Sequence, residues 1–302
     1  MYDKITKYVK RSPLKYMGGK FYMSNYILPF INYNVVTYVE PFLGAGQIFF
    51  KKENHKNEII NDIDNDLINF YLVWKNDKDK LINELKDYPY SKYIRDKFLN
   101  EWIQGYKGAN DLERAVRYFY ILRAGWLGFF YKRTFCFTIN GAAAYCYYNS
   151  IKLIEIMYER IKDATILNID YKKLLTTVLK NNEKVMIYCD PPYYGTESYY
   201  KDNTFNFDEH VKLAEILNKM DSNKYIIVSY FYFKELEDLY PRNKWFYYEF
   251  ERIKNSSPTH LTLNKKTKPI IKEIIILNYD INEIKKDNKK DNNKINTGVL
   301  FD

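Results

Sequence analysis

The chain has 302 residues, 46% of them hydrophobic, which is enough to bury the core of one large domain or of two ordinary ones. No uninterrupted apolar stretch approaches the roughly 20 residues of a membrane span, and the charged start MYDKITKYVKRSP is not expected to be a secretory signal. The formal charge of +9 favours a polyanionic partner, although the abundance of Lys, Asn, Ile and Tyr throughout offers a compositional alternative.

Cysteine and histidine argue against a metal site. Cys136, Cys146 and Cys189 lack metal-ligand spacing, and the three histidines are scattered along the chain. We therefore expect no bound metal, free thiols, and a cytoplasmic or nucleoid-associated protein.

The first part of the chain, up to about residue 66, alternates strand and helix patterns. Residues 35–39 predict a strand, residues 47–50 open a helix after two glycines, and residues 58–62 predict a second strand that ends on an acidic residue. Such alternation predicts a parallel sheet of the α/β class.

The pattern changes at about residue 67, where helical periodicity begins to dominate. Aromatic and basic residues then crowd together in RYFYILRAGWLGFFYKRTF, and a glycine-containing loop follows. Alternation returns after residue 164. The later predicted elements are strands at 165–169, 185–189, 225–229 and 270–277 and a helix near 208–219.

These changes predict the domain organisation. We expect a catalytic α/β domain made of residues 1–66 and 162–282, with a mostly helical insert at residues 67–161. Residues 283–302 form a low-complexity, highly charged tail, for which disorder is the expectation.

Two turns after the first predicted strands indicate a nucleoside site. In YVEPFLGAG, residues 38–46, Gly44 and Gly46 let the backbone approach a ligand where a helix begins. Asp62 ends the next strand, and an acidic residue about 20 positions after such a turn commonly binds ribose hydroxyls. A dinucleotide is less favoured, because Phe49 occupies the last glycine position of the longer motif.

The stretch VMIYCDPPYYG, residues 185–195, joins an apolar strand to a carboxylate, two prolines and an aromatic ring. An exocyclic amine is a poor nucleophile, because its lone pair is delocalised into the ring that bears it. The Asp190 carboxylate and the Pro191 carbonyl could accept hydrogen bonds from such an amine, while the ring of Tyr193 stacks on the base. The alternative interpretation is a Pro-Pro turn with a capping aspartate.

Four blocks of sequence together carry a family resemblance. SPLKYMGGK, EPFLGAG, NDIDNDLINFY and IYCDPPY occur in that order. They resemble the blocks of the DNA adenine-N6 methyltransferases of the Dam family (the D12 class), which read approximately LKWxGGK, EPFxGxG, DINxDLI and DPPY. The resemblance covers roughly residues 12–66 and 166–278, and the motif order matches the α-group, in which the insert is the target-recognition domain.

The resemblance implies a Rossmann-like, S-adenosylmethionine-dependent methyltransferase domain, which flips an adenine out of DNA and methylates it directly. Asp190, Pro191 and Tyr193 would grip the flipped adenine, with Asp190 also close to the cofactor. The other implied cofactor-binding residues are Tyr16 against the cofactor, Lys20 on its carboxylate, Phe42, Gly44 and Gly46 as its cradle, Asp62 on its ribose and, as a weaker candidate, Asp170 near its adenine.

The insert departs from the family pattern, which is approximately NRxGYNGLCRYN. Trp126 falls where an aromatic residue wedges into the duplex, but Tyr131 replaces an arginine that reads guanine in GATC-specific members. We therefore expect a relaxed or shorter adenine-containing site. The implied DNA-binding residues are Lys15, Arg123, Trp126, Tyr131, Lys132 and Arg133. For Phe129 and Phe130, a place in the core of the insert is the alternative.

Double-stranded DNA is the expected partner, and no membrane is expected. A cognate restriction endonuclease and the oligomeric state are left open by the sequence. One alternative function is a non-catalytic nucleic-acid-binding subunit, against which the intact D-P-P-Y motif argues. Another is amino-methylation of cytosine N4 or of RNA, but the Lys-x-x-Gly-Gly-Lys block and the insert favour adenine in DNA.

Overall fold

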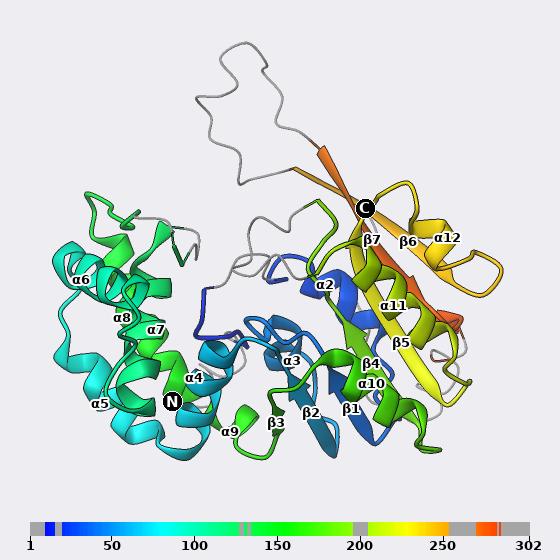
Figure 1. Cartoon of the computed structure of the whole chain (residues 1–302), viewed down its shortest axis with the longest axis horizontal. Coiled ribbons are helices and arrows are strands. Elements are labelled where there is room, and N and C mark those ends of the chain that lie inside the picture. The colour runs from blue at the N-terminus through cyan, green and yellow to red at the C-terminus, as the bar shows by residue number, and fades with distance from the viewer. Residues whose placement is uncertain are drawn as a thin grey trace, which may run out of the picture. The chain divides into compact units, whose positions relative to one another are not determined.

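The computed structural model describes residues 10–15, 20–126, 130, 131, 134–195, 205–253, 270–282 and 284 (Figure 1). The chain divides into two compact units. The first comprises Met1–Pro29 and Tyr38–Thr177, and the second comprises Phe30–Thr37 and Val178–Asp302. The predicted division into catalytic domain, insert and tail is a division by role, which these two compact units do not test. It stays a prediction.

Within its described residues, the first unit contains three short strands of an α/β fold. They are β1 (Thr37–Glu40), β2 (Asn57–Asn61) and β3 (Thr165–Leu167), in the order β3-β2-β1. Strands β2 and β3 are parallel, with Ile60 opposite Ile166, although more than 100 residues separate them in sequence. The chain therefore leaves the sheet after β2 and returns to its neighbour after a long helical excursion.

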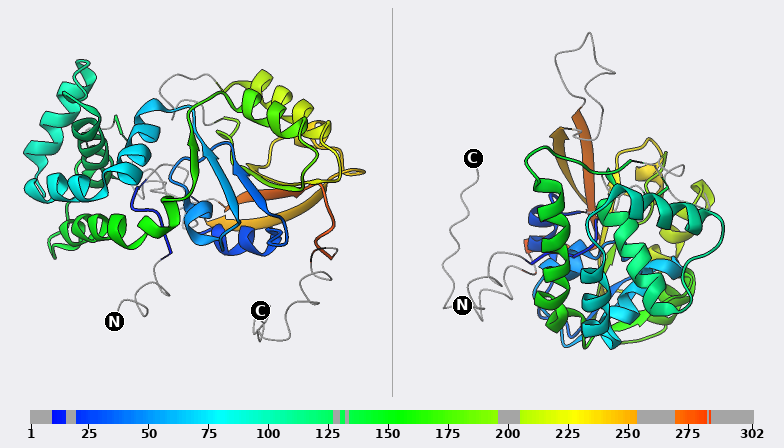
Figure 2. Two further views of the ribbon diagram at one scale, coloured as in Figure 1. Left: turned by 90° about the horizontal axis from the view of Figure 1, so that it is seen from below. Right: turned by 90° about the vertical axis from the view of Figure 1, so that its left-hand side faces the viewer.

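Helices make up the rest of the first unit. They are α2 (Ser24–Ile27), α3 (Gln47–Lys51), α4 (Asn65–Asn76), α5 (Lys78–Asp87), α6 (Lys92–Ile103), α7 (Asp111–Ala124), α8 (Ala142–Ile156), α9 (Tyr158–Ile161) and the start of α10 (Tyr171–Leu179). Figure 2 shows α5 to α8 gathered to one side of the strands of this unit.

Aromatic packing and capping explain why these helices form and pair. Asp64 caps α4 by accepting hydrogen bonds from the backbone N–H groups of Asp66 and Leu67. Phe70 of α4 stacks on Phe119 of α7 with ring centroids 5.7 Å apart, so the two helices share one apolar seam. The indole of Trp74 donates to the Ile154 carbonyl at 2.9 Å, which connects α4 to α8.

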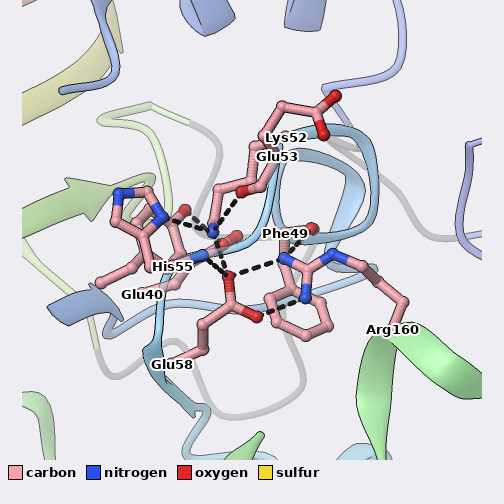
Figure 3. A network of polar contacts seen from close by, with 8 residues as sticks. Glu40, Phe49, Lys52, Glu53, His55, Glu58 and Arg160 are labelled. Atoms are coloured by element: carbon pink, nitrogen blue, oxygen red, sulfur yellow. Dashed lines mark hydrogen bonds and ion pairs between the residues drawn. The ribbon is translucent and has the colours of Figure 1, made fainter. Parts of the chain in front are cut away.

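A buried ionic network connects the end of the helical excursion to β2 and to the residue after α3 (Figure 3). The carboxylate of Glu58 on β2 lies between the ammonium of Lys52 and the guanidinium of Arg160 on α9. Arg160 also donates to the Phe49 carbonyl at 2.8 Å. Burial lowers the pKa of Lys52 to about 8, although the charge of Glu58 opposes this shift. Each charge in the network is thus desolvated and depends on its partners.

The described part of the second unit contains a mixed sheet flanked in sequence by helices. Its strands are β4 (Val185–Cys189), β5 (Lys224–Phe231), β7 (Ile270–Leu277) and β6 (Phe246–Ile253), in the order β4-β5-β7-β6. Strands β4 and β5 are parallel, whereas β7 runs antiparallel to both β5 and β6. The helices are α11 (Phe207–Asn218) and α12 (Leu236–Leu239).

The predicted α/β class is confirmed, and most predicted elements occur within one or two residues of their expected bounds. The strands predicted at 185–189 and 270–277 coincide with β4 and β7. Strand β6 was not predicted, because FYYEFERI mixes aromatic with charged residues and lacks the apolar run of a central strand. No helix within the described parts of the chain is long and apolar enough to span a membrane.

Candidate functional site

The turn after β1 has the backbone geometry that its glycines predict. Gly44 and Gly46 have φ angles of 49° and 65°, in the left-handed region that favours glycine. A Cβ at Gly46 would lie 3.1 Å from Cε2 of Phe50, so a larger residue would also crowd the start of α3. The ring of Phe42 lies 5.0 Å from that of Tyr171, between centroids. The turn is therefore compact, with Gly46 buried and Gly44 partly exposed.

Asp62 is tied directly to this turn. Its Oδ2 accepts a hydrogen bond from the Gly44 N–H at 2.8 Å, and its Oδ1 accepts one from the Asp64 N–H at 3.0 Å. Burial raises the pKa of Asp62 to about 6, and the neighbouring Asp64 charge adds to the shift, while the backbone hydrogen bonds oppose it. At neutral pH the group is a carboxylate, which can accept hydrogen bonds from ribose hydroxyls.

The other predicted cofactor residues lie at helix starts. Lys20 is buried, and its carbonyl accepts from the Ser24 N–H at 2.8 Å. Asp170 is exposed and accepts from the Lys172 N–H at 2.7 Å, at the start of α10. Tyr16 lies outside the described residues. Their cofactor roles stay predictions.

Asn61, the residue before Asp62, was not predicted from the sequence to contribute to this site. Asn61 is 1% exposed, and its side chain reaches the segments that follow both neighbouring strands. Its Nδ2 donates to the carbonyls of Pro41 and Ile169 at 2.9 and 3.0 Å. A polar residue at the end of an apolar strand was the available signal, but which backbone groups it meets depends on the strand order.

In the second unit, Asp190 directly follows the fully buried strand β4. Parallel pairing sets Cys189 opposite Val228, so the next residues on each strand, Asp190 and Ser229, come together. The Ser229 hydroxyl donates to Asp190 Oδ1 at 2.8 Å, and the Tyr188 hydroxyl lies 3.2 Å from Ser229 Oγ. Because serine has one hydroxyl hydrogen and gives it to Asp190, Tyr188 must be the donor to Ser229. The two hydroxyls thus form a directed chain that orients the carboxylate.

Tyr193 is held by a buried carboxylate. Its hydroxyl donates to Oε1 of Glu273 on β7 at 3.1 Å, and its ring packs edge-on against Phe231 with centroids 4.4 Å apart. Burial, reinforced by the charges of Asp190 and Glu273, raises the pKa of Tyr193 well above its usual value. The phenol therefore stays a neutral donor. Pro191, between the two side chains, is buried.

Glu273 and Ser229 were also not predicted from the sequence as residues of this site. Both are buried in strands that read as ordinary core, YIIVSYF and IIKEIIIL. The signal was a polar residue within each apolar run, Ser229 in the first and Glu273, next to Lys272, in the second, because buried polar groups need partners. Which partner each one has is set by the pairing of β5 with β4 and β7.

The predicted DNA-binding residues of the first unit gather where α7 ends. The Lys15 ammonium donates to the Gly125 carbonyl at 3.4 Å, and Arg123 donates to the Cys146 carbonyl at 2.9 Å. Trp126 is 50% exposed, while its backbone N–H donates to the Thr134 carbonyl at 3.1 Å. The chain thus turns back on itself and presents the indole to solvent.

Burial lowers the pKa of Arg123 to about 10, with a further contribution from the like charge of Arg11. It also lowers the pKa of Lys15, to which Arg123 contributes repulsion. The two cations therefore crowd one another beside the turn that carries Trp126.

The aromatic residues after this turn divide between core and surface. Phe130 is half-buried and packs against Trp102 and Tyr118 with centroids 5.1 and 5.3 Å apart. Tyr131 is 43% exposed. Phe129, Lys132 and Arg133 lie outside the described residues.

Comparison with known proteins gives a consistent result. The family described as D12 class N6 adenine-specific DNA methyltransferase matches residues 16–261. A type II methyltransferase of Methanocaldococcus jannaschii, M.MjaIII, is 28% identical over 247 residues, covering 69% of this chain and 79% of its own. A DNA adenine methylase of Vibrio cholerae is 26% identical, covering 72% and 80% respectively. Another, of Haemophilus influenzae, is 25% identical and covers 87% and 92%.

Proposed function

Because the chain belongs to the D12 class of N6 adenine-specific DNA methyltransferases, we propose that it methylates N6 of an adenine flipped out of double-stranded DNA. The observation that carries this proposal is the Asp190 carboxylate at the end of β4, oriented by Ser229. An amino group with a delocalised lone pair needs such an acceptor before it can act as a nucleophile.

The family implies S-adenosylmethionine as the methyl donor, and the residues of the first unit fit it. Gly44 and Gly46 adopt left-handed conformations beside the Asp62 carboxylate, which accepts from the Gly44 N–H, and Phe42 supplies an apolar ring. We assign the cofactor to Phe42, Gly44, Gly46 and Asp62, with Tyr16, Lys20 and Asp170 as further contacts. The bound cofactor supplies a methyl group activated by a sulfonium.

Asp190 acts on the amine. Its carboxylate and the Pro191 carbonyl each accept a hydrogen bond from one N–H of the N6 amino group. These bonds draw the nitrogen towards tetrahedral geometry. When N6 takes the methyl group, the carbon–sulfur bond of the sulfonium would break and positive charge would develop on the nitrogen, so an oriented anion stabilises the transition state more than the ground state. One N6 proton would then leave to solvent, with Asp190 as its first acceptor. The donor chain from Tyr188 through Ser229 keeps Asp190 ready for this role without reorganisation.

Tyr193 holds the base. Its ring stacks on the flipped adenine, an interaction that contributes about 1–3 kcal/mol per base in nucleic-acid complexes. Its own ring is fixed by Glu273 and Phe231, so it loses little conformational freedom when the base arrives.

We further assign residues 67–161 to DNA recognition. Trp126 is the candidate wedge, and Lys15, Arg123, Lys132 and Arg133 supply positive charge towards phosphates and base edges. Tyr131 offers one phenolic donor where a bidentate arginine would read guanine, which supports a relaxed site. Type II relatives make a cognate restriction endonuclease the second partner to test.

The test is a base-resolution map of N6-methyladenine in DNA from cells that express the chain, with an Asp190→Ala strain as control. The expected result is methylation at adenines of one short motif that disappears in the control strain. Methylation on cytosine N4, or none in DNA with intact protein present, would refute the proposal.

A further inference from the structure

Asn61 occupies the last position of β2 and connects the ends of three strands. Its Nδ2 donates to the Pro41 carbonyl, just after β1, at 2.9 Å. The same Nδ2 donates to the Ile169 carbonyl, two residues after β3, at 3.0 Å, and its Oδ1 accepts from the Ile169 N–H at 3.0 Å. Its backbone carbonyl accepts from the Leu43 N–H at 2.8 Å. With 1% of its surface exposed, Asn61 directs every one of these bonds inward.

The side-chain amide stands in for a peptide group. A backbone unit in a sheet offers one donor and one acceptor to its neighbour, and the carboxamide of Asn61 gives both to Ile169. It thereby continues the pairing of β2 with β3, whose last ladder position sets Asn61 opposite Leu167. A carboxylate has no donor at neutral pH, and a hydroxyl has one donor hydrogen where Asn61 uses two.

A second asparagine completes the brace from the opposite side. Asn168, which follows β3, donates from Nδ2 to the backbone carbonyl of Asp62 at 2.8 Å. Asp62 is therefore held by Asn168 through its main chain and by Gly44 through its carboxylate. Asn168 is exposed, so its removal leaves the buried bonds of Asn61 in place.

We propose that Asn61 is a positioning residue for the cofactor, which sets the separation between the Phe42–Gly46 turn and the carboxylate of Asp62. The inference rests on the proposed function, because it takes the nucleoside held there to be that of S-adenosylmethionine. Asn61 touches the carbonyl before Phe42 and precedes Asp62 in sequence, so one buried group fixes both sides of the cradle.

The test compares Asn61→Ala with Asn218→Ala in the full chain. Asn218 is a matched control, since it also makes three side-chain bonds. It donates to the Ala214 and Leu239 carbonyls at 2.8 and 2.9 Å and accepts from the Trp245 indole at 2.8 Å. These partners lie on or beside α11 and α12 and contribute nothing to the cradle. Both variants should lose thermal stability by similar amounts.

The deciding readout is the calorimetric Kd for S-adenosylmethionine without DNA. We expect Asn61→Ala to raise it by about tenfold or more, as loss of groups that orient ligand-binding residues commonly does. Asn218→Ala should leave it unchanged. At saturating cofactor, kcat of Asn61→Ala should stay within about threefold of the wild type, since Asp190 is untouched. An unchanged Kd in Asn61→Ala, with stability lost, would overturn the proposal.

Asn61→Ser decides the matter if Asn61→Ala does not fold. Its hydroxyl keeps one donor hydrogen but cannot replace both donor bonds to the Pro41 and Ile169 carbonyls, so the expected rise in Kd is smaller, about threefold, within the range of a single hydrogen bond. A Kd equal to that of the wild type would then overturn the proposal. Failure of the proposed function is distinct from either result, because the wild-type chain itself would not bind S-adenosylmethionine.

Discussion

The hydroxyl of Tyr193 donates a hydrogen bond to the carboxylate of Glu273, a residue 80 positions later that has no exposed surface. This bond fixes the orientation of the phenol ring and joins the D-P-P-Y turn to β7. Tyr193→Phe should therefore keep the aromatic ring but remove the hydrogen bond that fixes its orientation. The free energy of unfolding should fall by about 1–3 kcal/mol, because the Glu273 carboxylate loses this donor. Tyr193→Ala should lose base stacking as well, and with it most activity.

Fluorescence of 2-aminopurine at the target position measures the two effects. The phenylalanine variant should still give a changed signal on DNA binding, whereas the alanine variant should trap the flipped base poorly. If both variants lose activity equally, the hydroxyl has a role beyond fixing the ring.

Asp190→Ala should abolish methylation, because no other group we assign accepts the amine hydrogens with an ionised oxygen. Cofactor affinity should fall only modestly, which calorimetry can check. Ser229→Ala is the graded companion variant. It removes one donor at 2.8 Å from Asp190 Oδ1, so kcat should drop by about tenfold with little change in cofactor Kd. Near-normal turnover in Asp190→Ala would show that the catalytic assignment is wrong.

Cofactor binding should depend on the ionisation of Asp62. The pKa of Asp62 is raised to about 6. The carboxylate, which accepts hydrogen bonds from the ribose hydroxyls, is therefore mostly ionised above that pH and mostly protonated below it. The affinity for S-adenosylmethionine should be constant from pH 7 to 8 and fall by up to about tenfold per unit once the pH is below 6. Calorimetry across pH 5 to 8 measures this.

The control for this pH dependence is Asp62→Asn, which cannot ionise. It should bind the cofactor more weakly at pH 7.5 and show a nearly flat profile. Asp64 also has a raised pKa through burial, so a residual slope in the variant would point to that neighbour. A steep profile identical to the wild type would exclude Asp62 as the titrating group.

The residue pattern made much of this architecture predictable, because apolar runs and turn residues carry local information. The residues within a few positions of each feature are enough to predict the strand before Asp190 and the glycine turn after β1. The partners of Asp190 and Tyr193 could not be predicted in the same way. Ser229 and Glu273 lie 39 and 80 residues downstream, in runs that look like plain core, and reach the site only through strand order. Asn61 escaped for the same reason.

Specificity should change with a single substitution at Tyr131. A phenol offers one donor, whereas an arginine donates to both O6 and N7 of guanine, a pairing that is worth about 1–3 kcal/mol of discrimination. Tyr131→Arg should therefore narrow the methylated motif by strengthening the preference for guanine at one position. Tyr131→Phe is the matched control and should leave the motif as broad as in the wild type. A wild-type map restricted to GATC would contradict the expectation of a relaxed site.

The buried network around Glu58 should be a major source of stability. Glu58→Ala leaves the charges of Lys52 and Arg160 buried without their shared anion, and removal of one partner from such a group costs about 3–5 kcal/mol. Asp77→Ala, which breaks an exposed pair with Lys80, should cost less than about 1 kcal/mol. Urea unfolding of both variants measures the difference, and equal losses would show that the network is not what holds α9 to β2.

The helical excursion begins and ends at two strands that pair with each other, and this arrangement affects how such enzymes can diversify. The chain departs after Asn61, at the end of β2, and returns at Thr165, at the start of β3, and these two strands pair directly. Arg160, just before the return, binds Glu58 near the start of β2. The two strands at this junction are therefore held together whatever the intervening sequence does. A segment anchored in this way can be exchanged between related chains as a cassette, as long as the junction and its ion pairs are retained. The reading of DNA sequence could then evolve at a different pace from the chemistry of methyl transfer.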